Sequence, residues 1–283
     1  MLNWRGLMLF VVFGWACSGC TPPAPKVLKK PEQPKPTHYR TVRLKPFHHL
    51  ILGQHLRVKL RSGQHNRIGS RYLNMVHIDQ SQTGVLRIDS TYPNKNLLYL
   101  SAKQLPNHII LNGNSRLFYK VKKSSAPLKI TANAPGSIRL SGWFNLVDFD
   151  NPGGADLYAY WLNSQQTHIF SQAGRIFLAG RCQHLLAKLD GESKLDAYNL
   201  VSKHVWLMTS GSAMAKVKPS VSLNAQASQN SQVAYFNQLP LSQVTRHVFD
   251  QGNVVFVDRY FPTTRGHHWR HYRAHQHRIL KDA

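Results

Sequence analysis

A repeat of nineteen residues in the middle of the chain constrains its fold more than any other sequence feature. Between residues 135 and 236, an apolar residue within a short strand-like pattern recurs at this spacing, at Ile138, Leu157, Ile176, Leu195, Met214 and Val233. The residue two positions later is also apolar in five of the six repeats, at Leu140, Ala159, Leu178, Ala197 and Tyr235, with Lys216 as the exception. Such alternation is typical of a half-buried strand, so we predict that the first set forms one inward-facing column.

A second stripe follows half a repeat later. One set consists of Phe149, His168, Ala187, Trp206 and Ala225, and the set beside it consists of Phe170, Leu189, Met208 and Ala227. The spacing leaves open which of the two sets points inward. Turn-prone clusters such as Gly153-Gly154-Ala155 precede each first strand, and these residues permit the tight corners of a coil.

A fixed period of about 20 residues with two short strands and a corner is what a stacked solenoid requires, because one repeat alone cannot bury its apolar side. Leucine-rich repeats have a similar length but need more Leu and a regular Asn or Cys position. We therefore predict an all-β fold, a parallel β-helix or β-solenoid with rungs of about nineteen residues. Residues 38–133 are strand-rich without this register, so irregular rungs or an antiparallel cap are expected there.

The first nineteen residues have the order of a secretory signal peptide. Arg5 precedes an apolar run from Leu7 to Ala16, which is followed by Cys17-Ser18-Gly19-Cys20. About ten apolar residues cannot span a bilayer, which takes roughly 20. A cysteine directly after small residues resembles the lipobox of bacterial lipoproteins, in which that cysteine is acylated and begins the mature chain. Cys20 is the candidate lipidation site, and cleavage without lipidation is the alternative.

Residues 20–37 form the predicted tether. Six prolines among lysines favour extended polyproline geometry over a packed core. At roughly 3.1 Å per residue this spacer reaches up to about 50 Å. Its lysines could lie against anionic headgroups or belong to a merely soluble linker. If acylation consumes Cys20, Cys182 has no disulfide partner in the mature chain, and stability must come from packing.

The N-terminal strands and the repeated corners together resemble a known family. The N-terminal strands follow the order Phe47, Leu50-Ile51-Leu52-Gly53, the alternating Leu56 to Leu60, and Gly84 to Ile88. Gly-Ser corners that each open an apolar-x-apolar strand come after them. This arrangement is similar to the putative auto-transporter adhesin head GIN domain. The likeness covers roughly residues 43–257. It implies a β-helix-like fold and an envelope-exported or lipid-anchored protein. No catalytic or ligand-binding residues carry over from it.

Parallel β-helices also host polysaccharide lyases and hydrolases, which need clustered carboxylates. The chain has only twelve acidic residues, and its two local groups are Asp148, Asp150 and Asp156, and Asp190, Glu192 and Asp196. The nineteen-residue register stacks Asp156 on Arg175 and stacks no carboxylate on another. Cys182, the lone thiol of the repeat region, is expected to be a small buried residue rather than a nucleophile. We predict that the chain is not an enzyme and needs no cofactor, with a polysaccharide lyase or hydrolase as the alternative.

Charge narrows the choice of partner. Lys and Arg outnumber Asp and Glu by 36 to 12, for a formal net charge of +24 at pH 7. This balance favours anionic partners such as lipopolysaccharide, anionic phospholipid, acidic glycan and nucleic acid. Export and the lack of a nucleic-acid-binding motif argue against a dedicated nucleic-acid binder. An anionic polysaccharide or lipopolysaccharide is the expected partner, beside the membrane that holds the anchor.

The chain ends in a predicted flexible, basic and histidine-rich tail, residues 259–283. The candidate anion-binding residues in it are Arg265, Trp269, Arg270, Tyr272, Arg273 and Arg278, because guanidinium groups and aromatic rings suit phosphate contact and stacking. On a helix, His267, His271 and His275 would share a face with a spacing that can bind Zn²⁺ or Cu²⁺. A solvated tail without a specific role is the alternative.

These features together predict a lipoprotein of the bacterial outer membrane, either periplasmic or surface-exposed, with a structural or adhesive role. We expect the signal peptide at residues 1–19, the tether at 20–37, the β-solenoid domain at 38–258 and the tail at 259–283.

Overall fold

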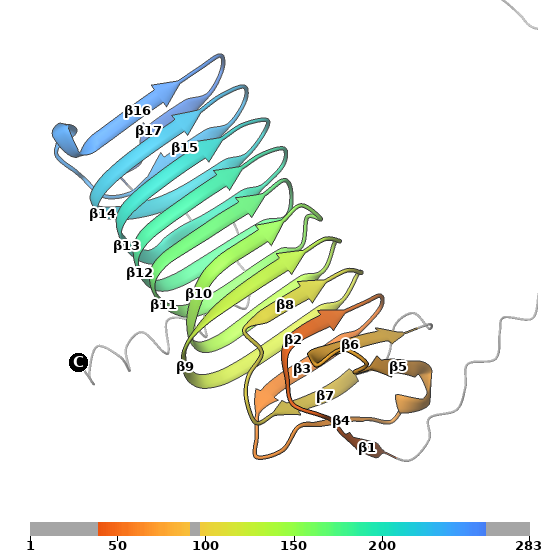
Figure 1. Cartoon of the computed structure of the whole chain (residues 1–283). Coiled ribbons are helices and arrows are strands. Elements are labelled where there is room, and N and C mark those ends of the chain that lie inside the picture. Colours follow the sequence, from red (N-terminus) through yellow and green to blue (C-terminus); the bar gives the residue numbers. More distant parts are fainter. Residues whose placement is uncertain (1–38, 91–96, 259–283) are drawn as a thin grey trace, which may run out of the picture. The chain divides into compact units, whose positions relative to one another are not determined.

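The computed structural model describes residues 39–90 and 97–258, which form a β-solenoid (Figure 1). The strands of these residues belong to one sheet of 17 strands that winds around a continuous apolar core. The predictions of an all-β fold and of a solenoid are therefore confirmed. Within the described ranges, the only helices are two turns of 3-10 helix, and no helix is long and apolar enough to cross a membrane. The predicted signal peptide, tether and tail lie outside the described residues.

Six long strands form the regular rungs, and each covers most of one turn. They are β9 (Arg116–Ala132), β10 (Ser137–Asn151), β11 (Asp156–Ser171), β12 (Arg175–Leu189), β13 (Lys194–Thr209) and β14 (Met214–Ala227). In β11, two successive residues that are not buried interrupt the in-out alternation at 160–161 and again at 165–166. Each rung therefore has three sides, which in β11 are residues 156–159, 162–165 and 167–171. We call them the first, middle and last sides.

The inward column predicted for the first side is confirmed at five of its six positions. Ile138, Leu157, Ile176 and Leu195 are successive register partners on parallel strands, and each is buried. Val233 continues the column further along the solenoid and is also buried. Apolar side chains from neighbouring rungs thus stack inside the coil, as a solenoid requires.

The prediction for Met214 was wrong. The rung from β13 to β14 is one residue longer than the average, so Ala215 and not Met214 lies in register with Leu195. Met214 faces outward and is 41% exposed. The same shift accounts for the exception at Lys216, because the second inward residue of this rung is Val217.

On the last side, neither of the two candidate sets points inward as a whole. The inward column is Phe149, Ile169, Ala187, Leu207 and Ala225, with separations that alternate between 20 and 18 residues. A uniform spacing of nineteen would place His168 and Trp206 in this column, but both face outward. Because side chains alternate between the two faces of a strand, a register error of one residue exchanges inside and outside.

Shorter strands form the N-terminal part. They are β1 (Arg40–Arg43), β2 (Phe47–Leu52), β3 (Arg57–Ser62), β4 (Arg67–Ser70), β5 (Val76–Asp79), β6 (Gly84–Ser90), β7 (Leu97–Ala102) and β8 (His108–Leu111), with the 3-10 turn η1 (Leu73–Met75). β4 pairs antiparallel with β7 and β1 with β4, while β5 pairs antiparallel with β6. These strands cover the end of the solenoid, where an open edge would otherwise invite pairing with another chain.

At this end the order of the rungs in space differs from their order in the sequence. β2 pairs in parallel with both β6 and β8, and β3 with both β7 and β9. The rung of β2 and β3 therefore lies between the rung of β6 and β7 and the rung that begins with β8 (Figure 1). Leu50 contacts Leu86 on one side and Ile109 on the other, at very different sequence separations. Both expected alternatives, irregular rungs and an antiparallel cap, are thus present.

The C-terminal rungs are shorter again. They consist of β15 (Gln232–Tyr235), the 3-10 turn η2 (Leu241–Gln243), β16 (Val244–Val248) and β17 (Asn253–Phe256). β16 pairs in parallel with the last side of β14, and β17 with β15.

Buried polar side chains hold the corners between rungs. The Asn151 side-chain amide donates to the carbonyl oxygens of Ala155 and Ala173, each at 2.9 Å, and its oxygen accepts the Ala155 N–H at 2.7 Å. The Ser193 hydroxyl donates to the carbonyl oxygen of Ser171 at 2.8 Å. A buried backbone group is costly unless it is hydrogen-bonded, so these amides and hydroxyls stabilise the tight turns.

Candidate functional site

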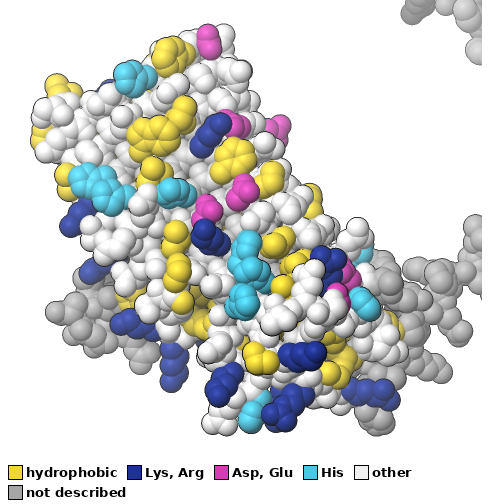
Figure 2. Space-filling view, in the orientation of Figure 1, with side chains coloured by type: hydrophobic (Ala, Val, Ile, Leu, Met, Phe, Trp, Pro, Cys, Tyr) yellow, Lys and Arg dark blue, Asp and Glu magenta, His cyan; other side chains and the backbone are white. Residues whose placement is uncertain are grey.

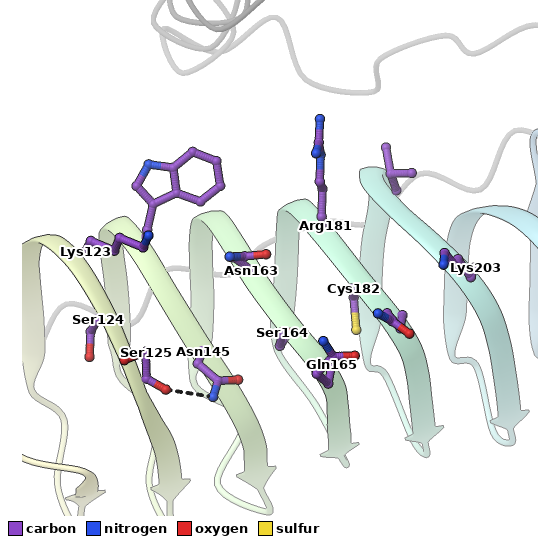
Figure 3. A pocket seen from close by; sticks show the side chains of 13 residues that line it. Lys123, Ser124, Ser125, Asn145, Asn163, Ser164, Gln165, Arg181, Cys182 and Lys203 are labelled. Atoms are coloured by element: carbon purple, nitrogen blue, oxygen red, sulfur yellow. Dashed lines mark hydrogen bonds between the residues drawn. The ribbon is translucent and has the colours of Figure 1, made fainter. Parts of the chain in front are cut away.

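A groove of about 350 Å³ crosses the middle side of the solenoid over β9 to β13 (Figure 3). It is lined by Lys123, Ser124, Ser125, Trp143, Asn145, Asn163, Ser164, Gln165, Arg181, Cys182, Gln183, Val201 and Lys203. Its volume lies in the range of ordinary small-ligand sites. Because the groove crosses five strands, it runs along the axis of the solenoid.

The corner before the middle side adjoins this groove through Trp143. Gly142 (φ 108°) and Gly180 (φ 127°) have left-handed backbone there, and a Cβ on Gly180 would lie 2.3 Å from the carbonyl oxygen of Leu162. Trp161 occupies the equivalent corner with φ 73°, a conformation that costs a bulky residue about 1–3 kcal/mol. Its ring packs against that of Trp143, which lines the groove, with 5.8 Å between ring centroids.

Polar side chains line the strands beyond the corner. Asn163, Arg181 and Val201 are register partners on three successive strands, and Figure 3 shows the Arg181 side chain extended away from the ribbon. The Asn145 amide donates to the carbonyl oxygen of Ser125 at 3.0 Å. Together with Gln165 and Gln183, these amides offer both hydrogen-bond donors and acceptors to a ligand.

The charge of the groove is entirely positive. Lys123, Arg181 and Lys203 are all exposed, and none of the thirteen lining residues is acidic. None of these three cations forms an ion pair with another described residue. The groove is therefore suited to an anionic ligand.

Cys182 is a free thiol at the floor of the groove and is 4% exposed. Burial raises the pKa of the Cys182 thiol, and the thiol donates to the carbonyl oxygen of His184 at 3.1 Å. A nucleophilic cysteine needs a lowered pKa and access to substrate. The expectation of a small buried residue is thus confirmed.

A second positively charged surface lies on the first side of β3, β9 and β10. Its outward residues are Arg57, Lys59, Arg61, Arg116, Lys120 and Arg139, which we call the basic surface. Arg57 is the register partner of Arg116, and Arg61 that of Lys120. The Arg139 guanidinium lies between the rings of Phe118 and Tyr158, at 5.7 and 5.4 Å from their centroids.

Like charges directly opposite each other on neighbouring strands destabilise a sheet. Among the described residues, none of the six cations of the basic surface has an ion-pair partner that would offset this repulsion. Figure 2 shows Lys and Arg side chains gathered toward the N-terminal end of the solenoid. The positive potential of such a surface attracts anionic groups.

Two histidines lie at the corner before the last side, next to an exposed tryptophan on that side. The rings of His184 and His204 stack with 4.9 Å between centroids, and His204 Nδ1 lies 2.9 Å from the Ser222 hydroxyl. Trp206 lies beside them in a shallow hollow of about 410 Å³. Within residues 39–90 and 97–258, no three His, Cys, Asp or Glu residues are placed to hold a metal ion.

Acidic residues do not face the groove. Asp148 lies between Lys129 and His168, one position away from the partner that a uniform spacing predicts. Burial raises the pKa of Asp150, and the neighbouring carboxylate of Asp148 raises it further. The predicted pair of Asp156 and Arg175 is confirmed, with the carboxylate 2.9 Å from the guanidinium.

The sequence-predicted site residues all lie outside the described residues. They are Cys20, Arg265, Trp269, Arg270, Tyr272, Arg273 and Arg278 for lipid and anion contact, and His267, His271 and His275 for metal. Sequence reasoning missed the groove. Its signal was the polar run in the middle of two successive repeats, at Asn163 to Gln166 and at Arg181 to His184.

Comparison with known proteins places this solenoid in a family. Residues 46–238 match the model of the putative auto-transporter adhesin, head GIN domain. A putative adhesin from Parabacteroides merdae is 17% identical, with a TM-score of 0.64 over 78% of this chain and 95% of that one. A putative adhesin from Parabacteroides distasonis is 16% identical, with a TM-score of 0.63 over 77% and 96% of the two chains.

A putative lipid binding protein from Parabacteroides distasonis is 11% identical, with a TM-score of 0.62 over 78% of this chain and 96% of that one. No curated protein matches the sequence. At such low identities the solved structures show a common fold and no common ligand. Because the family match covers more than half of the sequence, the chain belongs to the putative auto-transporter adhesin, head GIN domain family.

Proposed function

We propose that this protein is an adhesive or structural β-solenoid of the bacterial cell envelope. Acylated Cys20 would hold it at the outer membrane, and the solenoid would contact anionic glycan or lipid surfaces through charge, without chemical turnover. The adhesin family supports a place in the envelope, and the name of one structural neighbour, a lipid binding protein, agrees with a lipid surface as partner.

The observation that carries the proposal is the stacking of like charges on the basic surface. Arg57 opposite Arg116 and Arg61 opposite Lys120 repel each other across neighbouring strands. Sulfate, phosphate or carboxylate groups of a partner would relieve this repulsion and release their own counterions. Binding to such a partner is then expected to depend steeply on salt.

The test is the affinity of the full chain for heparin and for lipopolysaccharide as a function of salt concentration. The double variant Arg57→Gln/Arg116→Gln should weaken binding and should lower the slope of log K against log salt by up to about 2, one for each cation removed. The matched control is Arg175→Gln/Lys194→Gln, which removes a register pair of cations from the same side. Asp156 already neutralises Arg175, so the slope should change less.

Salt-insensitive affinity would contradict the proposal, as would cleavage of the glycan during the assay. Equal losses of affinity in the two double variants would show that binding depends on the net charge of the chain and not on the basic surface.

A further inference from the structure

We propose that the groove on the middle side binds an acidic polysaccharide, a sugar chain that carries anionic groups on its rings and lies along the solenoid axis. This inference rests on the proposed function and adds to it a shaped site, located on a different side of the rungs from the basic surface. Trp143 would stack on a sugar ring, while Arg181 and Lys203 would pair with the anionic groups.

Three kinds of group that such a ligand needs meet in the groove. A sugar ring has an apolar face, and the indole of Trp143 presents a broad apolar surface to it. Sugar hydroxyls both donate and accept hydrogen bonds, as do the side-chain amides of Asn163 and Gln183. Anionic groups need cations, and these are supplied without a competing acid in the lining.

The spacing along the axis suits a polymer better than a single compact anion. Trp143 lies on β10, Arg181 on β12 and Lys203 on β13. Since neighbouring strands are about 4.8 Å apart, the indole and the guanidinium are separated by roughly 10 Å along the axis. A ligand must be extended to reach both, and a sugar chain along the groove would meet one strand after another.

The corner of the neighbouring rung holds the Trp143 side chain in place. Its ring packs against Trp161, whose backbone has φ 73° where the neighbouring rungs have glycine. A bulky residue rarely adopts this conformation, and the strain is offset where its side chain has a role. The role of Trp161 is to support the indole of Trp143 in the groove.

The experiment compares ligands that share charge but differ in rings. Calorimetry would measure binding of the full chain to oligogalacturonate, to dextran sulfate, to neutral maltohexaose and to polyglutamate. We expect at least one acidic sugar chain to bind more tightly than polyglutamate of the same charge, and maltohexaose to bind weakly. The first two ligands distinguish carboxylate from sulfate as the anionic group.

Two matched pairs of variants locate the site. Trp143→Ala should weaken binding about tenfold, as expected for loss of an aromatic contact, whereas Trp206→Ala on the last side should not. Lys203→Gln should weaken binding more than Lys194→Gln, which removes the same charge from the first side of the same strand. Trp143→Phe should keep most of the affinity, and circular dichroism would check that every variant is folded. If Trp143→Ala fails to fold, the lysine pair decides.

Equal affinity for polyglutamate and the acidic sugars, or unchanged affinity in both Trp143→Ala and Lys203→Gln, would overturn the inference. Heparin binding that stays salt-dependent in these cases would leave the proposed function intact. If the full chain binds none of these anions, the proposed function itself is refuted.

Discussion

Leu195 on β13 lies in register with Ala215 on β14, twenty residues later, and the larger Met214 is turned outward beside it. An inward column therefore contains an alanine at a point where a uniform spacing would place methionine. Because protein interiors are close-packed, stability depends on which residue occupies each inward position.

This relationship separates two variants that the sequence alone treats as equivalent. Leu195→Ala should lower the free energy of unfolding by about 2–5 kcal/mol, because it leaves a cavity in the core. Met214→Ala should change it by about 0.5 kcal/mol or less, because the side chain is partly solvated. Urea unfolding of the two variants measures the difference. Similar losses would place Met214 in the core and contradict the register.

The corner at Gly180 should not accept a side chain. Its φ of 127° is strained for any L residue with a Cβ, and the added atom would lie 2.3 Å from the Leu162 carbonyl oxygen. We expect Gly180→Ala to lower the free energy of unfolding by about 1–3 kcal/mol or more. The same urea titration measures it, and an unchanged midpoint would show that the corner relaxes freely.

The Cys182 thiol should be protected in the folded protein. Burial raises its pKa above the value in the unfolded chain, so the folded state keeps its proton at a pH where the unfolded thiol ionises. The contribution of this thiol to stability should therefore fall as the pH rises above about 9, the ordinary value of a thiol. In a Cys17→Ser/Cys20→Ser background, alkylation by iodoacetamide at pH 8 should be slow until urea is added. Rapid reaction of the native protein would indicate an accessible nucleophile.

The proposed lipid anchor depends on the side chain of Cys20, which lies outside the described residues. If Cys20 is acylated, Cys20→Ser should release the protein from the membrane fraction of its host, whereas Cys17→Ser should not. Fractionation followed by mass spectrometry of the N-terminal peptide provides the measurement. Retention of the Cys20→Ser protein in the membrane would contradict lipidation as the anchor.

The basic tail should add to anion binding. Deletion of residues 263–283 should weaken binding to heparin and flatten its salt dependence, because it removes the arginines that we expect to contact anionic groups. Lowering the pH from 7 to 5 should tighten binding of the full chain more than that of the truncated chain, since the tail histidines gain charge. Equal pH responses would show that the tail does not take part.

The fold class could be predicted because a solenoid repeats its chemistry along the chain. Apolar residues at an average spacing of nineteen, with Gly and Ser at the corners, indicate stacked rungs. Periodicity gives the average length of a rung, however, and not the individual lengths. On the last side these are 20 and 18 residues in turn, so a uniform spacing groups the outward His168 and Trp206 with inward residues such as Phe149.

The N-terminal part shows a different limit of prediction from the sequence. β2 and β3 are inserted between rungs that follow them in the sequence, so their partners lie far away along the chain. No local pattern reports such a pairing, because contacts between distant segments depend on which surfaces fit together in space. The groove could not be predicted for the same reason, since its cations and its tryptophan come from different rungs.

The sequence by itself thus determined the all-β class, the repeated rung and the positive charge, since each of these follows from local alternation, period or composition. Only the tertiary structure decided which residue of each rung faces inward, which like charges are stacked, and that Trp143, Arg181 and Lys203 share one groove. The physical reason is that a strand exposes alternate residues to opposite sides. A shift of one residue at a corner, which costs the chain little, reverses the role of every side chain that follows on that side.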